Sequence, residues 1–231
     1  KDNKEKLGVA VGLMRFIYKF KYNNEFKNAE PLIIELCSKG INEQSPKVRV
    51  DSIHILRKLL VASKKPDLFI RYLPKILEIA EESHSLESDD FMATWNAIQL
   101  FCMFLNIPEE GAQRYYDVCI KATTDETIEP GVRTIPLHAT IAVLKYLDSE
   151  QIEFLIKHDI ALNAEFMEEN KEVPDDEGYF VIDHLLSYMP RTDIYMVIKK
   201  QIIESSSKYQ LLASVLCFRV VMSRTPSICI E

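Results

Sequence analysis

The apolar residues of this chain recur with a period of about 42 residues, and this recurrence constrains the fold more than any other feature. Within residues 31–62, an apolar run at helical spacing is followed by a polar break at 42–46 and by a second apolar helical run. The Val48-Arg49 pair of the second run reappears two periods later as Val132-Arg133. Two helices per repeat of about 40–47 residues are typical of helical solenoids.

The apolar face of the second helix keeps its register in the following repeats. The residues 42 positions later are all apolar, and those 84 positions later are apolar in three of four cases. Ile53, Leu56, Leu59 and Leu60 correspond to Trp95, Ile98, Phe101 and Cys102, and then to Leu137, Thr140, Val143 and Leu144. The chain has 6 glycines and no sustained period-2 alternation, which argues against a β fold. We therefore expect an all-α fold.

We expect a single domain that spans residues 1–231 and contains about five helix hairpins. The first helix, at about 3–20, aligns with the second helix of a repeat, which predicts that the chain is a fragment of a longer solenoid. Pro136 falls inside a predicted helix and should kink it or move its start. An acidic run that contains Pro174 predicts a loop at about 165–177. The predicted repeats are roughly 1–22 (partial), 29–62, 67–105, 109–147, 149–189 and 191–224.

The repeat resembles the unit of the HEAT-repeat (armadillo-like) family. That unit is an A helix, a short turn and a B helix opened by a Val-Arg pair, as in residues 45–50 and 129–133. Family members often carry an acidic residue in the turn, and Glu43 stands six positions before Arg49, whereas Thr127 occupies that place before Arg133. The resemblance implies a right-handed α-α superhelix, a solenoid whose B helices line a concave surface.

Positive charge gathers in the first third of the chain. Residues 1–75 contain 16 Lys and Arg against 8 Asp and Glu, although the whole chain has a net charge of −7. A basic end of this kind could bind acidic protein or nucleic acid. The alternative is that these lysines only solvate exposed helix faces.

Three residues occupy one repeat position on successive B helices: Arg15, Arg57 and Gln99 are 42 positions apart. Helices stacked about 10 Å apart would align them into a polar row, which Arg49 and Lys58 could flank. Guanidinium groups suit carboxylates or phosphates, because their planar fork makes paired hydrogen bonds. This row is the predicted partner-binding site. The alternative, in which Arg15 and Arg57 each pair with a nearby acidic side chain, stays open.

The sequence contains no recognisable motif for catalysis, for a cofactor or for a metal ion. Its 5 histidines form no HExxH pair and no zinc-ligand spacing with cysteine, and no phosphate-binding glycine motif or GxSxG sequence is present. Trp95, together with Phe101 and Phe104, is expected in the core and not on a base-stacking surface. We expect no enzyme, no cofactor and no small-molecule substrate.

The sequence also predicts the compartment. It shows no signal peptide, and its longest apolar run, 211–222, is interrupted by Arg219 and is too short to cross a bilayer. The 5 cysteines show no paired spacing, and Cys37, Cys102, Cys119 and Cys217 lie in apolar helical stretches, as reduced core thiols do. We expect no membrane association and an intracellular location, cytoplasmic or nuclear.

Two functions fit these features. The first is a non-catalytic scaffold or adaptor that holds an extended peptide or a helix of a partner protein, acidic in its chemistry, along the concave B-helix face. The alternative is a nucleic-acid- or chromosome-associated HEAT subunit whose basic N-terminal portion contacts phosphates. The net negative charge of the chain favours the first.

Overall fold

The computed structural model describes residues 6, 9, 24–63, 66–171, 181–186 and 191–224, and across these residues it contains helices and no strands. The predicted first helix at about 3–20 lies outside the described residues, apart from Lys6 and Val9, which are both helical. The chain forms two compact units, residues 1–111 and 112–231, and each is described by itself. The expectation of one domain over the whole chain stays a prediction.

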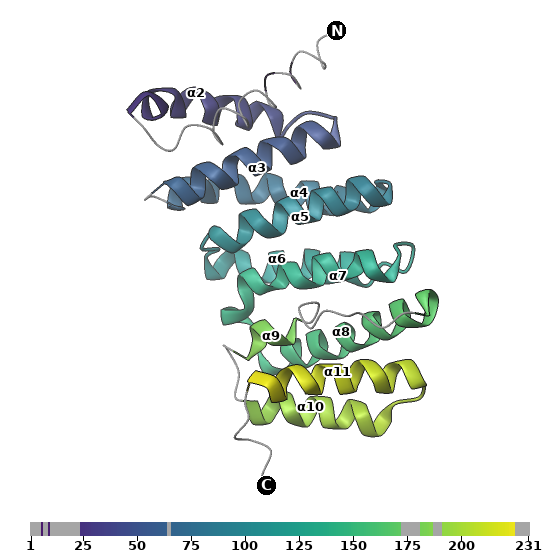
Figure 1. The fold of residues 1–231 in the computed structure, drawn as a ribbon. Coiled ribbons are helices and arrows are strands. Elements are labelled where there is room, and N and C mark those ends of the chain that lie inside the picture. The colour runs from purple at the N-terminus through teal and green to yellow at the C-terminus, as the bar shows by residue number, and fades with distance from the viewer. Residues whose placement is uncertain are drawn as a thin grey trace. The chain divides into compact units, whose positions relative to one another are not determined.

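Unit 1 consists of two helix hairpins (Figure 1). In the first, α2 (Asn24–Gly40) packs on α3 (Pro46–Ala62). Gly40 allows their close approach, because a Cβ at this position would lie 2.0 Å from Ser52 Oγ of α3. In the second, a 3-10 segment, η1 (Pro66–Tyr72), leads into α4 (Leu73–Glu82), and a short 3-10 turn, η2 (Ser83–Ser85), leads to α5 (Ser88–Phe104). The helices α3 and α5 pack against each other along their length.

The helix bounds reproduce the period read from the sequence. The helix α3 starts at Pro46, α5 at Ser88 and α7 (Pro130–Ala139) at Pro130, in steps of 42, and α5 also ends 42 positions after α3. Every buried residue of α5 lies 42 positions after a buried residue of α3. The buried residues from Val132 to Leu144 lie 84 positions after buried residues of α3. The predicted apolar register of the B helices is therefore confirmed.

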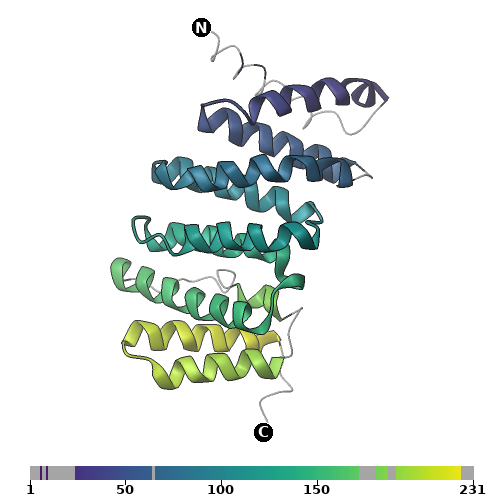
Figure 2. The same ribbon diagram turned by 180° about the vertical axis from the view of Figure 1, so that it is seen from behind.

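Unit 2 contains α6 (Glu109–Thr123) from Ala112 onward, α7, the 3-10 segment η3 (Thr140–Tyr146) and four further helices (Figures 1 and 2). These are α8 (Ser149–Asn170), α9 (Ile182–Leu185), α10 (Arg191–Glu204) and α11 (Lys208–Arg224). The helix α8 is the centre of this unit, since it packs against α7, α10 and α11. Its N-terminus carries a capping box, in which Asp148 accepts from the backbone N–H of Gln151 while the Gln151 side chain accepts from the backbone N–H of Asp148.

Pro136 leaves the start of its helix unchanged. The helix α7 begins at Pro130, as the period predicts, but its α-helical geometry ends at Ala139 and continues as the 3-10 segment η3. Pro136 has no N–H to donate to the carbonyl of Val132, so the regular α-helical ladder is interrupted in this helix. The side chain of Pro136 is buried at the position that Ser52 occupies in α3.

Two expectations for residues 149–189 need correction. The acidic run at about 165–177 begins inside a helix, because α8 continues to Asn170 and ends where Lys171 adopts a left-handed φ of 57°. Burial of Ala164 and Met167 extends the apolar face of α8 through this part. The second helix, expected at about 178–189, is reduced to the four residues of α9 within the described residues 181–186.

The core contains the side chains that the apolar register selects, with one exception. Trp95 is fully buried and donates its indole N–H to Ser83 Oγ over 2.9 Å, and Phe101 is buried beside it on α5. Phe104, expected with them in the core, is exposed because it lies at the last position of α5. The four cysteines Cys37, Cys102, Cys119 and Cys217 are buried. No helix in the described part of the chain is long and apolar enough to span a membrane.

Candidate protein-binding surface

The structure places two of the three predicted row residues on neighbouring helices. Arg57 of α3 and Gln99 of α5 are half-buried at equivalent positions of these packed helices. Arg15 lies outside the described residues. Lys58 is half-buried next to Arg57 on α3. The described part of the row is therefore the pair formed by Arg57 and Gln99, with Lys58 beside it.

Arg49, which was expected to flank the row, is instead an internal ion-pair residue. It is 9% exposed, and its Nη1 donates to Glu82 Oε2 at 2.7 Å, across the interval between α3 and the end of α4. Arg133 is its counterpart 84 positions later, and its Nη2 contacts both carboxylate oxygens of Glu165, at 2.9 and 3.0 Å. The Val-Arg arginine thus joins its helix to the next one. Glu43, the acidic turn residue, accepts from Lys6 Nζ instead.

The packed helices α3 and α5 leave one stripe of each uncovered, and we call these two stripes together the α3–α5 face. Each of its positions is exposed or half-buried. The helices run in the same direction and lie side by side in both views, so equivalent positions are neighbours (Figures 1 and 2). The face comprises Lys47, Asp51, His54, Arg57, Lys58 and Val61 on α3, and Asp89, Ala93, Asn96, Gln99, Leu100 and Met103 on α5.

Cationic side chains gather on the C-terminal half of α3, where Arg57 and Lys58 follow His54. The pKa of His54 is lowered by burial, and the charges of Arg57 and Lys58 lower it further, while Asp51 acts against them. Burial also raises the pKa of the Asp51 carboxyl, against the effect of Lys47 and His54. Arg57 Nε and Asp51 Oδ2 are buried without a hydrogen-bond partner. Such polar atoms are costly to leave unpaired, so a bound partner with complementary groups could lower the free energy of this face.

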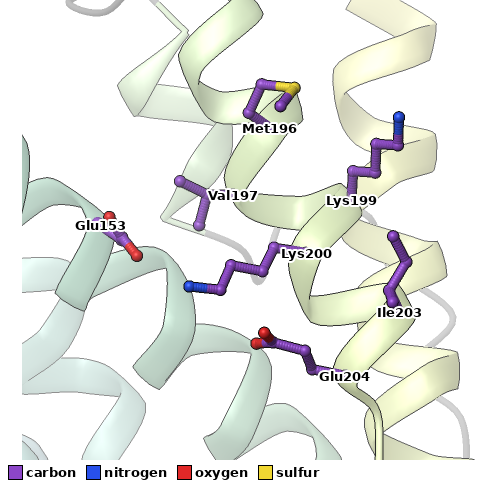
Figure 3. A pocket seen from close by; sticks show the side chains of 7 residues that line it. All are labelled: Glu153, Met196, Val197, Lys199, Lys200, Ile203 and Glu204. Carbon is purple, nitrogen blue, oxygen red and sulfur yellow. The ribbon is translucent and has the colours of Figure 1, made fainter.

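A hollow lies in unit 2 between α8 and α10 (Figure 3). Its volume is about 520 Å³, and its lining residues are Glu153 of α8 with Met196, Val197, Lys199, Lys200, Ile203 and Glu204 of α10. Lys200 points toward Glu153 and Glu204 in Figure 3. The hydrogen bond and charge of Lys157 lower the pKa of Glu153, so its carboxyl stays ionised and is unsuited to act as a general acid near neutral pH. The lining combines cationic, anionic and apolar side chains.

The most perturbed carboxyl group of unit 2 is fully enclosed. Asp159 of α8 accepts hydrogen bonds from the backbone N–H of Val181 at 2.7 Å and from Asn163 Nδ2 at 3.1 Å. Burial raises its pKa to about 8, although hydrogen bonds from Val181, Asn163 and Ile182 act in the opposite direction. Asp159 is buried and binds the backbone at the start of α9, so we assign it the structural task of holding α9 against α8.

The functional candidates that sequence reasoning missed are apolar. Val61 and Met103 occupy equivalent positions of the α3–α5 face, and Phe104 follows Met103 at the end of α5. The 42-residue register contains a signal for the first two, because neither position coincides with the buried stripe of its helix. Among the described residues, no group of three His, Cys, Asp or Glu side chains is arranged to hold a metal ion. The α3–α5 face combines charged, polar and apolar side chains.

Comparison of the chain with protein-family models, with curated proteins and with solved structures gave no match. The proposal that follows therefore depends on the residues and their geometry.

Proposed function

We propose that this chain is a non-catalytic scaffold or adaptor that binds a segment of a partner protein along the α3–α5 face. The observation that supports this most directly is the shared register of the uncovered positions on two packed helices. Together they offer a surface two helices wide, in which most charged side chains lie on α3 and most apolar ones on α5, with Val61 and Met103 at its C-terminal end. A groove or face of this kind suits an extended segment or an amphipathic helix, which adds contacts at each turn.

We further propose that the hairpins continue into a HEAT-like right-handed solenoid in which this face is concave. The helix starts at 46, 88 and 130 and the repeated arginine–glutamate pairs support a regular repeat. Small-angle X-ray scattering tests this part. A compact globule of this length has a radius of gyration of roughly 17 Å, and the solenoid predicts a clearly larger value. A radius of gyration of about 17 Å would contradict the solenoid, but it would not test the proposal that the α3–α5 face binds a partner.

We propose an intracellular location, which the burial of Cys37, Cys102, Cys119 and Cys217 in helices supports. Binding to nucleic acid stays a prediction from the sequence. Half of the 16 Lys and Arg of residues 1–75 fall in residues 1–23 or at 64 and 65. Of the remainder, Lys39, Arg49 and Lys75 are already paired with glutamates. The described part of unit 1 therefore gives no specific support to phosphate binding.

A peptide-display selection on the whole chain tests the proposed function. The selected peptides are measured by fluorescence anisotropy against the native chain, Val61→Asp and Leu32→Asp. Val61 and Leu32 are 57% and 59% exposed, but Leu32 lies on α2, outside the face. Loss of one buried apolar contact should weaken binding to Val61→Asp about tenfold or more, with Leu32→Asp unchanged. Equal affinity for all three chains, or a library without enriched binders, would contradict the proposal.

A further inference from the structure

The two helices of the α3–α5 face end together in an apolar patch. In Figure 1 both run toward the same side of unit 1 and end there, α3 at Ala62 and α5 at Phe104. Val61, Met103 and Phe104 are 57%, 45% and 48% exposed, and we call these three residues the anchor patch. Single exposed apolar residues are ordinary, but three on adjacent helix ends are typical of interaction surfaces.

Cations border the anchor patch without acidic neighbours on the same helices. Arg57 and Lys58 lie about one helical turn before Val61 on α3. Residues 52–62 and 91–104 contain no Asp or Glu, so no carboxylate of α3 or α5 offsets these charges near the patch. The adjoining η1 contributes one exposed carboxylate, Asp67, and one exposed guanidinium, Arg71, which donates to the Tyr72 hydroxyl. The lowered pKa of His54, due first to burial and then to Arg57 and Lys58, is consistent with a positive field at this place.

A segment bound over this end must satisfy both features. Covering the anchor patch with a large apolar side chain removes apolar surface from water, worth roughly 25 cal/mol per Å². The same contact desolvates Arg57, whose Nε is already buried without a partner. A neutral or basic segment would leave that guanidinium uncompensated, whereas a carboxylate would form a charge-assisted and geometrically matched pair with it.

We propose that the C-terminal end of the α3–α5 face binds an acidic segment of a partner protein, in which a large apolar side chain lies within about one helical turn of a carboxylate. This inference rests on the proposed function and specifies the partner's chemistry. The apolar side chain contacts Val61, Met103 and Phe104, and the carboxylate pairs with Arg57.

The composition of the peptides selected on the whole chain is the first test. The inference predicts enrichment of Asp or Glu three or four positions from Leu, Met, Phe or Trp. Enriched peptides that are neutral or basic, yet lose affinity for Val61→Asp, would overturn this inference and leave the proposed function standing. If the selected peptides bind Val61→Asp as tightly as the native chain, or if no peptide is enriched, both this inference and the proposed function are overturned.

A charge exchange is the second test, with the strongest acidic peptide as the probe. Arg57→Glu should weaken its binding about tenfold or more, and the peptide with its carboxylate residue changed to Lys should recover affinity for that variant. Arg71→Glu is the control, because Arg71 is an exposed arginine on η1, outside the face. Circular dichroism melts establish that the variants fold. If the Lys-substituted peptide does not recover affinity for Arg57→Glu, the pairing with Arg57 is contradicted. An equal loss of affinity in Arg71→Glu would contradict it as well.

A single-stranded oligonucleotide is included as a competitor. The inference predicts that it does not displace the peptide at physiological salt, since phosphates provide no group for the anchor patch. Displacement that disappears steeply as salt rises would assign the cations to nucleic acid and overturn the proposal.

Discussion

The hairpin of α4 and α5 and the hairpin of α8 and α9 occupy corresponding places in the repeat, yet they are completed in different ways. In the first, a full helix of 17 residues follows the A helix. In the second, α9 has four residues, and the buried carboxyl of Asp159 receives the backbone N–H of Val181 at its start. A buried side-chain acceptor therefore satisfies a backbone N–H at the start of α9.

The regular hairpins use a different polar device. Arg49 and Arg133 each reach from a B helix to a glutamate on a following A helix, and both glutamates remain about half in water. Such a pair joins consecutive hairpins at little desolvation cost to the carboxylate. Asp159 is enclosed on all sides, so its stabilising effect depends on protonation. The comparison thus separates a partly exposed ion pair from a buried carboxyl group whose contribution to stability depends on pH.

The largest expected effect is the pH dependence that Asp159 gives to stability. Its pKa is about 8 in the folded chain against an ordinary 3.8, so the folded state binds the extra proton between these values. The free energy of unfolding should therefore fall as pH rises from 5 to 8, by up to about 1.4 kcal/mol per pH unit. Urea unfolding of the native chain and of Asp159→Asn measures this.

The informative quantity is the difference in free energy of unfolding between the native chain and Asp159→Asn. The lowered pKa values of His54 and His158 act in the opposite direction, since their stabilising effect grows as pH rises, and both histidines are present in both chains. The difference should shrink from pH 5 to 8. A difference that stays constant over this range would contradict a buried, protonated Asp159.

The arginine pairs should show smaller effects of unequal size. Arg133→Met removes two contacts to Glu165 and should lower the free energy of unfolding by about 2 kcal/mol, and Arg49→Met, which removes one contact to Glu82, by about 1 kcal/mol. Double-mutant cycles with Glu165→Gln and Glu82→Gln check the pairing, and coupling energies near zero would show that the arginines act by packing alone.

The smallest effect concerns His54 on the α3–α5 face. Arg57→Gln removes a cation that lowers the pKa of His54, so this pKa should rise toward its ordinary value of 6.5. An NMR titration of the imidazole Cε1–H resonance measures the change. His158 is the internal reference, because burial and Arg133 lower its pKa, and Arg57 plays no part. An unchanged pKa of His54 in Arg57→Gln would contradict a contribution of the Arg57 charge to it.

Much of the architecture follows from the period in the sequence. The starts of α3, α5 and α7 and their buried faces could be predicted, because apolar side chains at fixed helical positions must meet the neighbouring hairpins. The partner of Arg49 could not, since Glu82 comes from the next hairpin and a nearer acid, Glu43, competes for it in the sequence. A contact between repeats depends on the angle at which they pack, which a one-dimensional pattern does not contain.

The hydrogen bond between Asp159 and the backbone N–H of Val181 could not be predicted from the sequence for a related reason. Asp159 shares the apolar spacing of Leu155, Ile156 and Met167 on α8, so its burial could have been noticed, but the backbone group it accepts lies 22 positions later. Of the candidate site, Arg57, Gln99 and Lys58 were identified from the register, whereas the anchor patch was not. Phe104 was assigned to the core because a helical pattern gives no sign of where its helix ends.

Amide hydrogen exchange of the whole chain, with and without the strongest selected peptide, tests the central claim most directly. The account predicts added protection in residues 54–61 of α3 and 96–104 of α5, with α2, α10 and the hollow between α8 and α10 unchanged. Protection confined to α10 or to α2, with none on α3 and α5, would contradict the assignment of the α3–α5 face as the partner-binding surface.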